Sequence, residues 1–80
     1  MKLSKLPKHT EAIITKIGAN EDLRQRFYSF GIVKGASIFV ETISFAKNTI
    51  EVNVEDTDIG LRVVEADTIE VELLKWHQWR

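Results

Sequence analysis

The chain has 80 residues, of which 44% are hydrophobic and 29% charged, a balance typical of one small folded domain rather than of a disordered chain. It contains no cysteine, which excludes a disulfide framework, a thiolate metal site and a thiol nucleophile. The formal net charge is −1, with an excess of basic residues over 1–34 and of acidic residues over 35–80.

Residues 1–10 form a basic lead-in, in which Leu3 and Leu6 can both pack on a core. The segment lacks the apolar region of a signal peptide, and no apolar run approaches the roughly 20 residues that cross a bilayer. We therefore expect a cytoplasmic protein with no direct membrane insertion.

The next two elements are a strand and a helix. Residues 11–17 are rich in β-branched side chains, which favour a strand. Asn20 suits the N-cap of a helix of about ten residues that follows. Leu23, Phe27 and Phe30 recur at helical spacing, so we expect them to form one apolar stripe.

Gly31 predicts where this helix stops. A left-handed residue after a helix costs least as glycine, and counting back from Gly31 places Phe27 and Ile32 as the hydrophobic pair of a Schellman motif. A second glycine, Gly35, then predicts a tight turn into the next strand.

Beyond Gly35 apolar residues alternate with polar ones, which is the period of half-buried strands. The pattern predicts strands over 36–41, 50–55, 59–64 and 69–74, separated by a loop at 45–48, an acidic turn at 55–58 and a short turn at 65–67. We therefore expect a mainly β fold, a small antiparallel barrel of about five strands with one helix inserted after the first strand. Closure of the barrel would remove exposed sheet edges.

The order of these elements resembles the FeoA family over about residues 6–74. The matching residues are Leu23, Arg24 and Arg26 on the helix, Phe30-Gly31-Ile32 at its end, Gly35, Ile38 and Val40 at the second strand, Ile50, Ile59-Gly60-Leu61-Arg62 with Glu65-Ala66, and Ile69 with Val71. The central loop departs from the family, because Phe45-Ala46-Lys47-Asn48-Thr49 stands where glycine and proline are usual.

The resemblance implies one FeoA-like SH3 domain over residues 1–80, with a Trp-containing tail at 75–80 beyond the core. It further implies a small accessory protein of ferrous iron uptake. Its partner would be the membrane ferrous iron transporter, FeoB, whose transport or nucleotide cycle it would modulate. Two alternatives stay open: an SH3-like interaction module related to the C-terminal domain of metal-dependent repressors, or a small metal-binding protein.

The sequence offers little for catalysis. No serine has an evident histidine and carboxylate near it, and His9 and His77 lie near the two ends of the chain. Residues 31–35 do not have the spacing of a phosphate-binding loop. We therefore expect no enzyme and no cofactor.

Metal ligands are also sparse. Glu55, Asp56 and Asp58 make a small acidic cluster, but it lacks EF-hand spacing, and an ordinary solvated turn is the favoured interpretation. His9 and His77 could form a weak surface site if the two ends of the chain lie together.

Binding to another protein is the role that the residues favour. The chain lacks the strongly basic face that nucleic acid requires. Exposed aromatic and arginine side chains are typical anchors of protein interfaces. The candidate partner-binding residues are Arg24, Arg26, Tyr28, Phe45, Trp76 and Trp79. The two tryptophans could instead cover one open end of the barrel.

Overall fold

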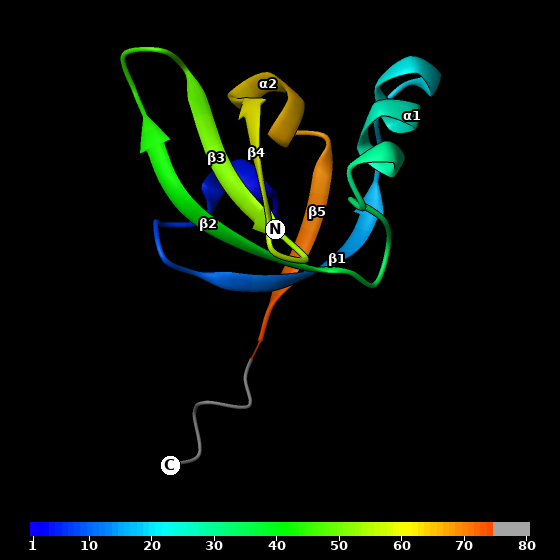
Figure 1. Cartoon of the computed structure of the whole chain (residues 1–80), viewed down its shortest axis with the longest axis horizontal. Helices are drawn as coiled ribbons and strands as arrows, with labels where there is room; N and C mark the ends of the chain where they lie inside the picture. Colours follow the sequence, from blue (N-terminus) through cyan, green and yellow to red (C-terminus); the bar gives the residue numbers. More distant parts are fainter. Residues whose placement is uncertain (75–80) are drawn as a thin grey trace.

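The computed structural model describes residues 1–74 of the chain (Figure 1). A short 3-10 turn at Leu3–Lys5 precedes the first strand. The other elements are β1 (Glu11–Ile17), α1 (Glu21–Ser29), β2 (Ser37–Ser44), β3 (Thr49–Val54), β4 (Thr57–Arg62), α2 (Val63–Ala66) and β5 (Ile69–Leu73). The predicted mainly β architecture, with a helix after the first strand, is confirmed.

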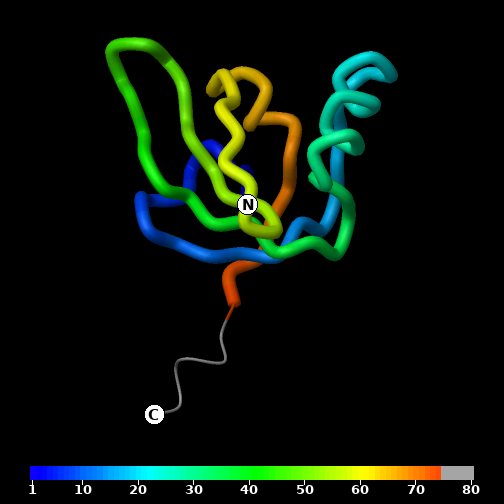
Figure 2. The backbone as a smooth tube through the Cα atoms, in the orientation of Figure 1, coloured from blue at the N-terminus to red at the C-terminus, as the bar shows by residue number. Residues whose placement is uncertain are grey.

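The strands form one antiparallel sheet in the order β4-β3-β2-β1-β5. The sheet bends strongly around the core, as the tube in Figure 2 shows, so the molecule has the shape of a small barrel. Its ladder does not close, because β4 and β5 are the two ends of the sheet. The N-terminal segment covers β5 instead: the Val71 amide donates to the Met1 carbonyl at 2.7 Å, and Lys2 bridges to Glu70.

The core lies on the concave side of this sheet. Leu3 and Leu6 are buried in it, as their spacing predicted. The inward residues of the strands fill most of the remainder: Ala12, Ile14, Ile38, Val40, Ile50, Val52, Val54, Ile59, Leu61, Ile69 and Val71. Alternate residues therefore point outward, and the outer face of β2, β3 and β4 carries mainly polar side chains.

α1 begins and ends as its sequence predicts. The Asn20 side chain accepts a hydrogen bond from the Leu23 amide at 2.9 Å, which caps the first turn. At the other end Gly31 has φ +85°, and the Ile32 amide donates to the Phe27 carbonyl at 2.9 Å. This is the Schellman arrangement, and its two hydrophobic partners, Phe27 and Ile32, are both fully buried.

The prediction that Phe30 belongs to the buried apolar stripe of this helix is wrong. It is the C-cap residue, and 41% of its surface is exposed. The helical period no longer applies where the backbone turns toward Gly31. After that turn Gly35, with φ +93°, donates its amide to the Ile14 carbonyl at 2.7 Å, which confirms the predicted tight entry into β2.

Several boundaries differ from the prediction: β2 extends to Ser44 rather than to 41, and larger differences follow β3. The acidic turn comprises only Glu55 and Asp56, both with positive φ as in a two-residue type I′ hairpin, and β4 already begins at Thr57. The alternating pattern over 59–64 was read as one strand, but β4 ends at Arg62 and the next four residues form α2. Residues 65–67 are therefore the end of a helical turn rather than a separate turn.

Candidate interaction surface

The three predicted partner-binding residues of α1 have different surroundings. Arg24 donates from Nη2 to the carbonyl of Ala19 at 3.0 Å, which ties its side chain to the start of the helix. Arg26 forms an ion pair with Glu65 of α2, with 3.2 Å between Nη1 and Oε2. Tyr28 is 45% exposed. The ring of Tyr28 is therefore partly exposed to solvent, whereas both arginines make contacts within the fold.

Phe45 is the most exposed large hydrophobic residue among the described residues, with 86% of its surface accessible. It lies in the loop that joins β2 to β3, where the Lys47 amide donates to the Ser44 hydroxyl at 3.3 Å. An aromatic ring held in solvent by a structured hairpin is a typical anchor for a protein partner. Trp76 and Trp79, the other predicted aromatic anchors, lie outside the described residues.

α2 lies between the β2–β3 hairpin and α1, as Figure 1 shows, and the sequence did not predict it. Its first amide, that of Val63, donates to the Asn48 carbonyl at 2.9 Å, which joins it to the hairpin loop. Its Glu65 accepts from the Arg62 amide through Oε1 at 3.0 Å and from Arg26 of α1 through Oε2. One carboxylate thus caps α2 and links it to α1.

A hollow of about 630 Å³ separates the hairpin loop from α2. Val64 at its edge is 67% exposed, the second most exposed large hydrophobic residue described. We call the following set the hairpin–α2 surface: Phe45, Lys47, Asn48, Thr49, Arg62, Val63 and Val64. The sequence indicates that Phe45 is exposed, but it does not single out Val64, because Val64 continues the alternating pattern of the strand before it.

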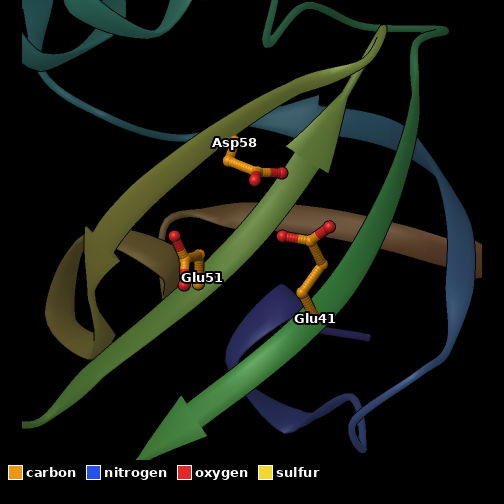
Figure 3. A group of neighbouring side chains, drawn as sticks. All are labelled: Glu41, Glu51 and Asp58. Carbon is orange, nitrogen blue, oxygen red and sulfur yellow. The ribbon is translucent and has the colours of Figure 1, made fainter.

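A separate group of carboxylates gathers on the outer face of the sheet (Figure 3). Oxygens of Glu41, Glu51 and Asp58 all lie within 4.8 Å of one another. Glu41 is the extra residue of a β-bulge between Val40 and Thr42, and its side chain lies on the outer face that Glu51 and Asp58 share. Carboxylate oxygens are hard ligands that suit cations such as Mg²⁺, Ca²⁺ or Mn²⁺.

Glu41 and Asp58 shift each other's pKa in opposite directions. A hydrogen bond to Asp58, with some desolvation and the charges of Asp58 and Glu51, raises the pKa of Glu41 above its usual value. Asn53 donates to Asp58 at 2.9 Å, and this bond, with the one from Glu41, lowers the pKa of Asp58. As pH falls, Glu41 is therefore protonated before Asp58. In the hydrogen bond between them Glu41 donates and Asp58 accepts.

The predicted metal candidates do not assemble as expected. Of the acidic turn residues, Asp58 belongs to the carboxylate cluster, but Glu55 and Asp56 do not; Glu41 and Glu51 take their places. The imidazole of His9 stacks on the ring of Phe39, with 6.2 Å between centroids. His77 lies outside the described residues, so its meeting with His9 stays a prediction.

None of the helices within residues 1–74 is long and apolar enough to cross a membrane.

Comparison with known proteins places the chain in a family. The family model described as FeoA domain matches residues 1–73. A Campylobacter jejuni protein named "Putative Fe(2+) transport protein A" is 35% identical over 74 residues, which cover 92% of this chain and all of the relative.

Solved structures agree with this assignment. The FeoA protein of Chlorobium tepidum superposes with a TM-score of 0.87 at 34% identity, over 92% of this chain and 70% of that one. FeoA of Stenotrophomonas maltophilia, a prokaryotic SH3 domain protein crystallised with zinc, gives 0.79 at 30% identity, over 90% and 89%. A manganese-dependent transcriptional repressor shares the fold alone, at 20% identity and a TM-score of 0.86, over 92% of this chain and 36% of that one. The chain is a member of the FeoA family, implicated in ferrous iron transport, and has its SH3-like fold.

Proposed function

We propose that this protein is a cytoplasmic accessory protein of ferrous iron uptake that acts by binding a FeoB-type membrane transporter. Docking would modulate transport or the nucleotide cycle of the transporter's GTP-binding domain. Family membership supports the iron pathway, and a ferrous iron transport activating factor is the role suggested for the Stenotrophomonas maltophilia relative. In this proposal the protein carries out no catalysis of its own.

The observation that carries the proposal is the exposure of Phe45 in the loop that contacts α2 through Asn48. A small protein gains nothing in its own stability from a ring that is 86% exposed, since the ring remains in contact with water. Burying such an aromatic side chain against a partner is a common source of binding energy at interfaces. The neighbouring Val64 would extend the apolar contact.

The α1 residues supply the other side of the proposed contact. Tyr28 presents a partly exposed ring, and Arg26 lies beside α2 through its ion pair with Glu65. Arg24 would contribute charge at the start of the helix. Trp76 and Trp79 complete the predicted set, and a chain shortened to residues 1–74 tests their part directly.

The test is a pull-down of the purified full-length protein with the transporter in detergent, and with the isolated GTP-binding domain alongside. Each binding reaction is run without nucleotide, with GDP and with a non-hydrolysable GTP analogue. Retention on the full transporter would support the proposal, and retention on the isolated domain would locate the contact. Binding to neither, in all three nucleotide states, would overturn it.

An SH3-like interaction module related to the repressor C-terminal domain is the second candidate, and the shared fold favours it. In that case the protein would bind a partner outside the transport system and ignore the transporter. A role as a metal-binding protein would instead need the carboxylate cluster. Calorimetric titration with Mn²⁺, comparing the protein with its Glu51→Gln variant, separates this role from both binding roles.

A further inference from the structure

The hollow between the β2–β3 hairpin loop and α2 has a fixed floor. The Val63 amide bonds to the Asn48 carbonyl at 2.9 Å, and Thr49 pairs in register with Arg62 across β3 and β4. The hairpin loop and α2 are therefore joined in two ways, by the hydrogen bond from Val63 to Asn48 and by the pairing of β3 with β4. A hollow fixed in this way can receive a ligand without first having to order its own walls.

The lining of the hollow combines apolar and positively charged side chains. Val63 is half-buried, and Val64 offers most of its side chain to solvent. Lys47 from the loop and Arg62 from the end of β4 also line the hollow, and we call these two cations its positive rim. Both are exposed, and neither forms an ion pair with another residue in the part of the chain described.

The nearby carboxylates do not cancel this positive rim. Glu65 is engaged by Arg26 and by the Arg62 amide, and its side chain is only 16% exposed. Glu51 lies diagonally across the strand pair from Arg62, but the described residues include no ion pair between them. The rim cations are therefore available to an incoming acidic group.

We propose that this hollow binds a short peptide segment of the partner in which apolar side chains are flanked by acidic ones. The inference rests on the proposed function for the existence of a protein partner, and adds the chemistry of the segment that docks. The apolar side chains would lie on Val63 and Val64, with the acidic ones against Lys47 and Arg62. Nucleic acid fits less well, since its backbone requires a larger basic face than two cations.

The first arm of the test uses two synthetic peptides. The acidic probe is acetyl-EDLFED-amide, and its charge-reversed control is acetyl-KKLFKK-amide. Each is titrated into the ¹⁵N-labelled full-length protein, and amide shifts are followed by NMR. We expect the acidic peptide to shift amides of residues 45–49 and 62–64, with shifts that weaken as salt is raised, because the rim contacts are exposed. Equal shifts of these amides by the basic peptide, or none by the acidic one, would overturn the inference.

The second arm uses charge-reversed protein. Lys47→Glu should weaken binding of the acidic peptide about fivefold or more, since a favourable exposed contact becomes a repulsive one. Lys34→Glu is the matched control, because Lys34 is an exposed lysine outside the hollow. Equal affinities of the two variants would contradict the inference.

The transporter itself separates this inference from the proposed function. If Phe45→Ala weakens transporter binding while Lys47→Glu leaves it unchanged, the proposed function stands and the acidic segment is wrong. If the transporter does not bind but the acidic peptide does so with the expected dependence on Lys47, the proposed function falls and the chemistry of the hollow stands.

Discussion

Glu65 is the side chain whose removal should most specifically loosen α2. Its Oε1 accepts the Arg62 amide at 3.0 Å and its Oε2 lies 3.2 Å from Nη1 of Arg26. Glu65→Ala removes both interactions, Glu65→Gln keeps an oxygen for the amide but removes the charge, and Arg26→Gln removes only the ion pair. The three variants therefore separate the cap from the ion pair.

The expected magnitudes follow from exposure. A helix cap contributes about 1 kcal/mol. The ion pair should contribute under about 1 kcal/mol, because the Arg26 side chain is 56% exposed and solvent screens it. Glu65→Ala should then lower the free energy of unfolding by about 1–2 kcal/mol, which corresponds to a loss of roughly 5–15 °C in Tm for a domain of this size. Glu65→Gln and Arg26→Gln should each cost under about 1 kcal/mol.

Urea denaturation followed by circular dichroism measures these differences, with Glu72→Ala as the control for loss of an exposed glutamate. If Glu65→Ala costs no more than Arg26→Gln, then Glu65 does not cap α2 and the reasoning fails. A functional consequence should accompany the stability loss. Because Glu65 caps α2, and the Val63 amide of α2 bonds to the hairpin loop, Glu65→Ala should also weaken transporter binding more than Arg26→Gln does.

Three further predictions concern the core, the helix stop and the carboxylate cluster. Phe27→Ala should cost about 3–5 kcal/mol in urea unfolding, because its ring is fully buried; a cost below 1 kcal/mol would show that the site collapses around the deletion. Gly31→Ala should cost about 1–2 kcal/mol through its backbone alone, since φ is +85° and an added Cβ would lie 3.7 Å from the nearest Val54 atom, an ordinary contact; an unchanged unfolding midpoint would refute this. Glu41→Gln should stabilise the protein at neutral pH. The pKa of Glu41 is raised in the folded protein. This carboxyl therefore contributes to folding stability below its ordinary pKa of 4.5, and that contribution is lost as pH rises through the folded pKa. The gain should therefore shrink in urea titrations as pH falls through the raised pKa toward 4.5, and a gain that grows at low pH would contradict it.

The parts of the fold that local sequence determines could be predicted. Asn20 and Gly31 define the ends of α1 because caps act through neighbouring backbone groups. The alternation over 50–55 predicts β3 because one of its faces is buried and the other exposed. In both elements the residues that determine the structure lie within a few positions of the backbone that they shape.

α2 could not be predicted in the same way. Val63 and Val64 are β-branched and continue the alternation of β4, so local preference favours a strand. The helical turn is selected instead by Glu65 binding the Arg62 amide and Arg26, and by the Val63 amide reaching Asn48. Tertiary contacts outweigh propensity here, and they are not visible in the sequence.

The carboxylate cluster was missed for a similar reason. Asp58 was assigned to an acidic turn, whereas it belongs to β4 and lies close to Glu51 of β3 and Glu41 of β2. Placing the three together requires the register of β2, β3 and β4, including the bulge at Glu41. The exposure of Phe45 was predictable because an aromatic residue in a loop needs no register to be noticed, and its role as an anchor stays a prediction.

The measurement that tests the central claim most directly is the affinity of the full-length protein for the detergent-solubilised transporter, compared among the wild type and the Phe45→Ala and Val33→Ala variants. Val33 is the control, because it is an exposed apolar residue, 39% accessible, outside the hairpin–α2 surface. The account predicts a Kd for Phe45→Ala at least about tenfold weaker than wild type, as for an interface anchor, and a Kd for Val33→Ala within about twofold. Equal affinity of all three proteins would contradict the claim that this surface docks the transporter.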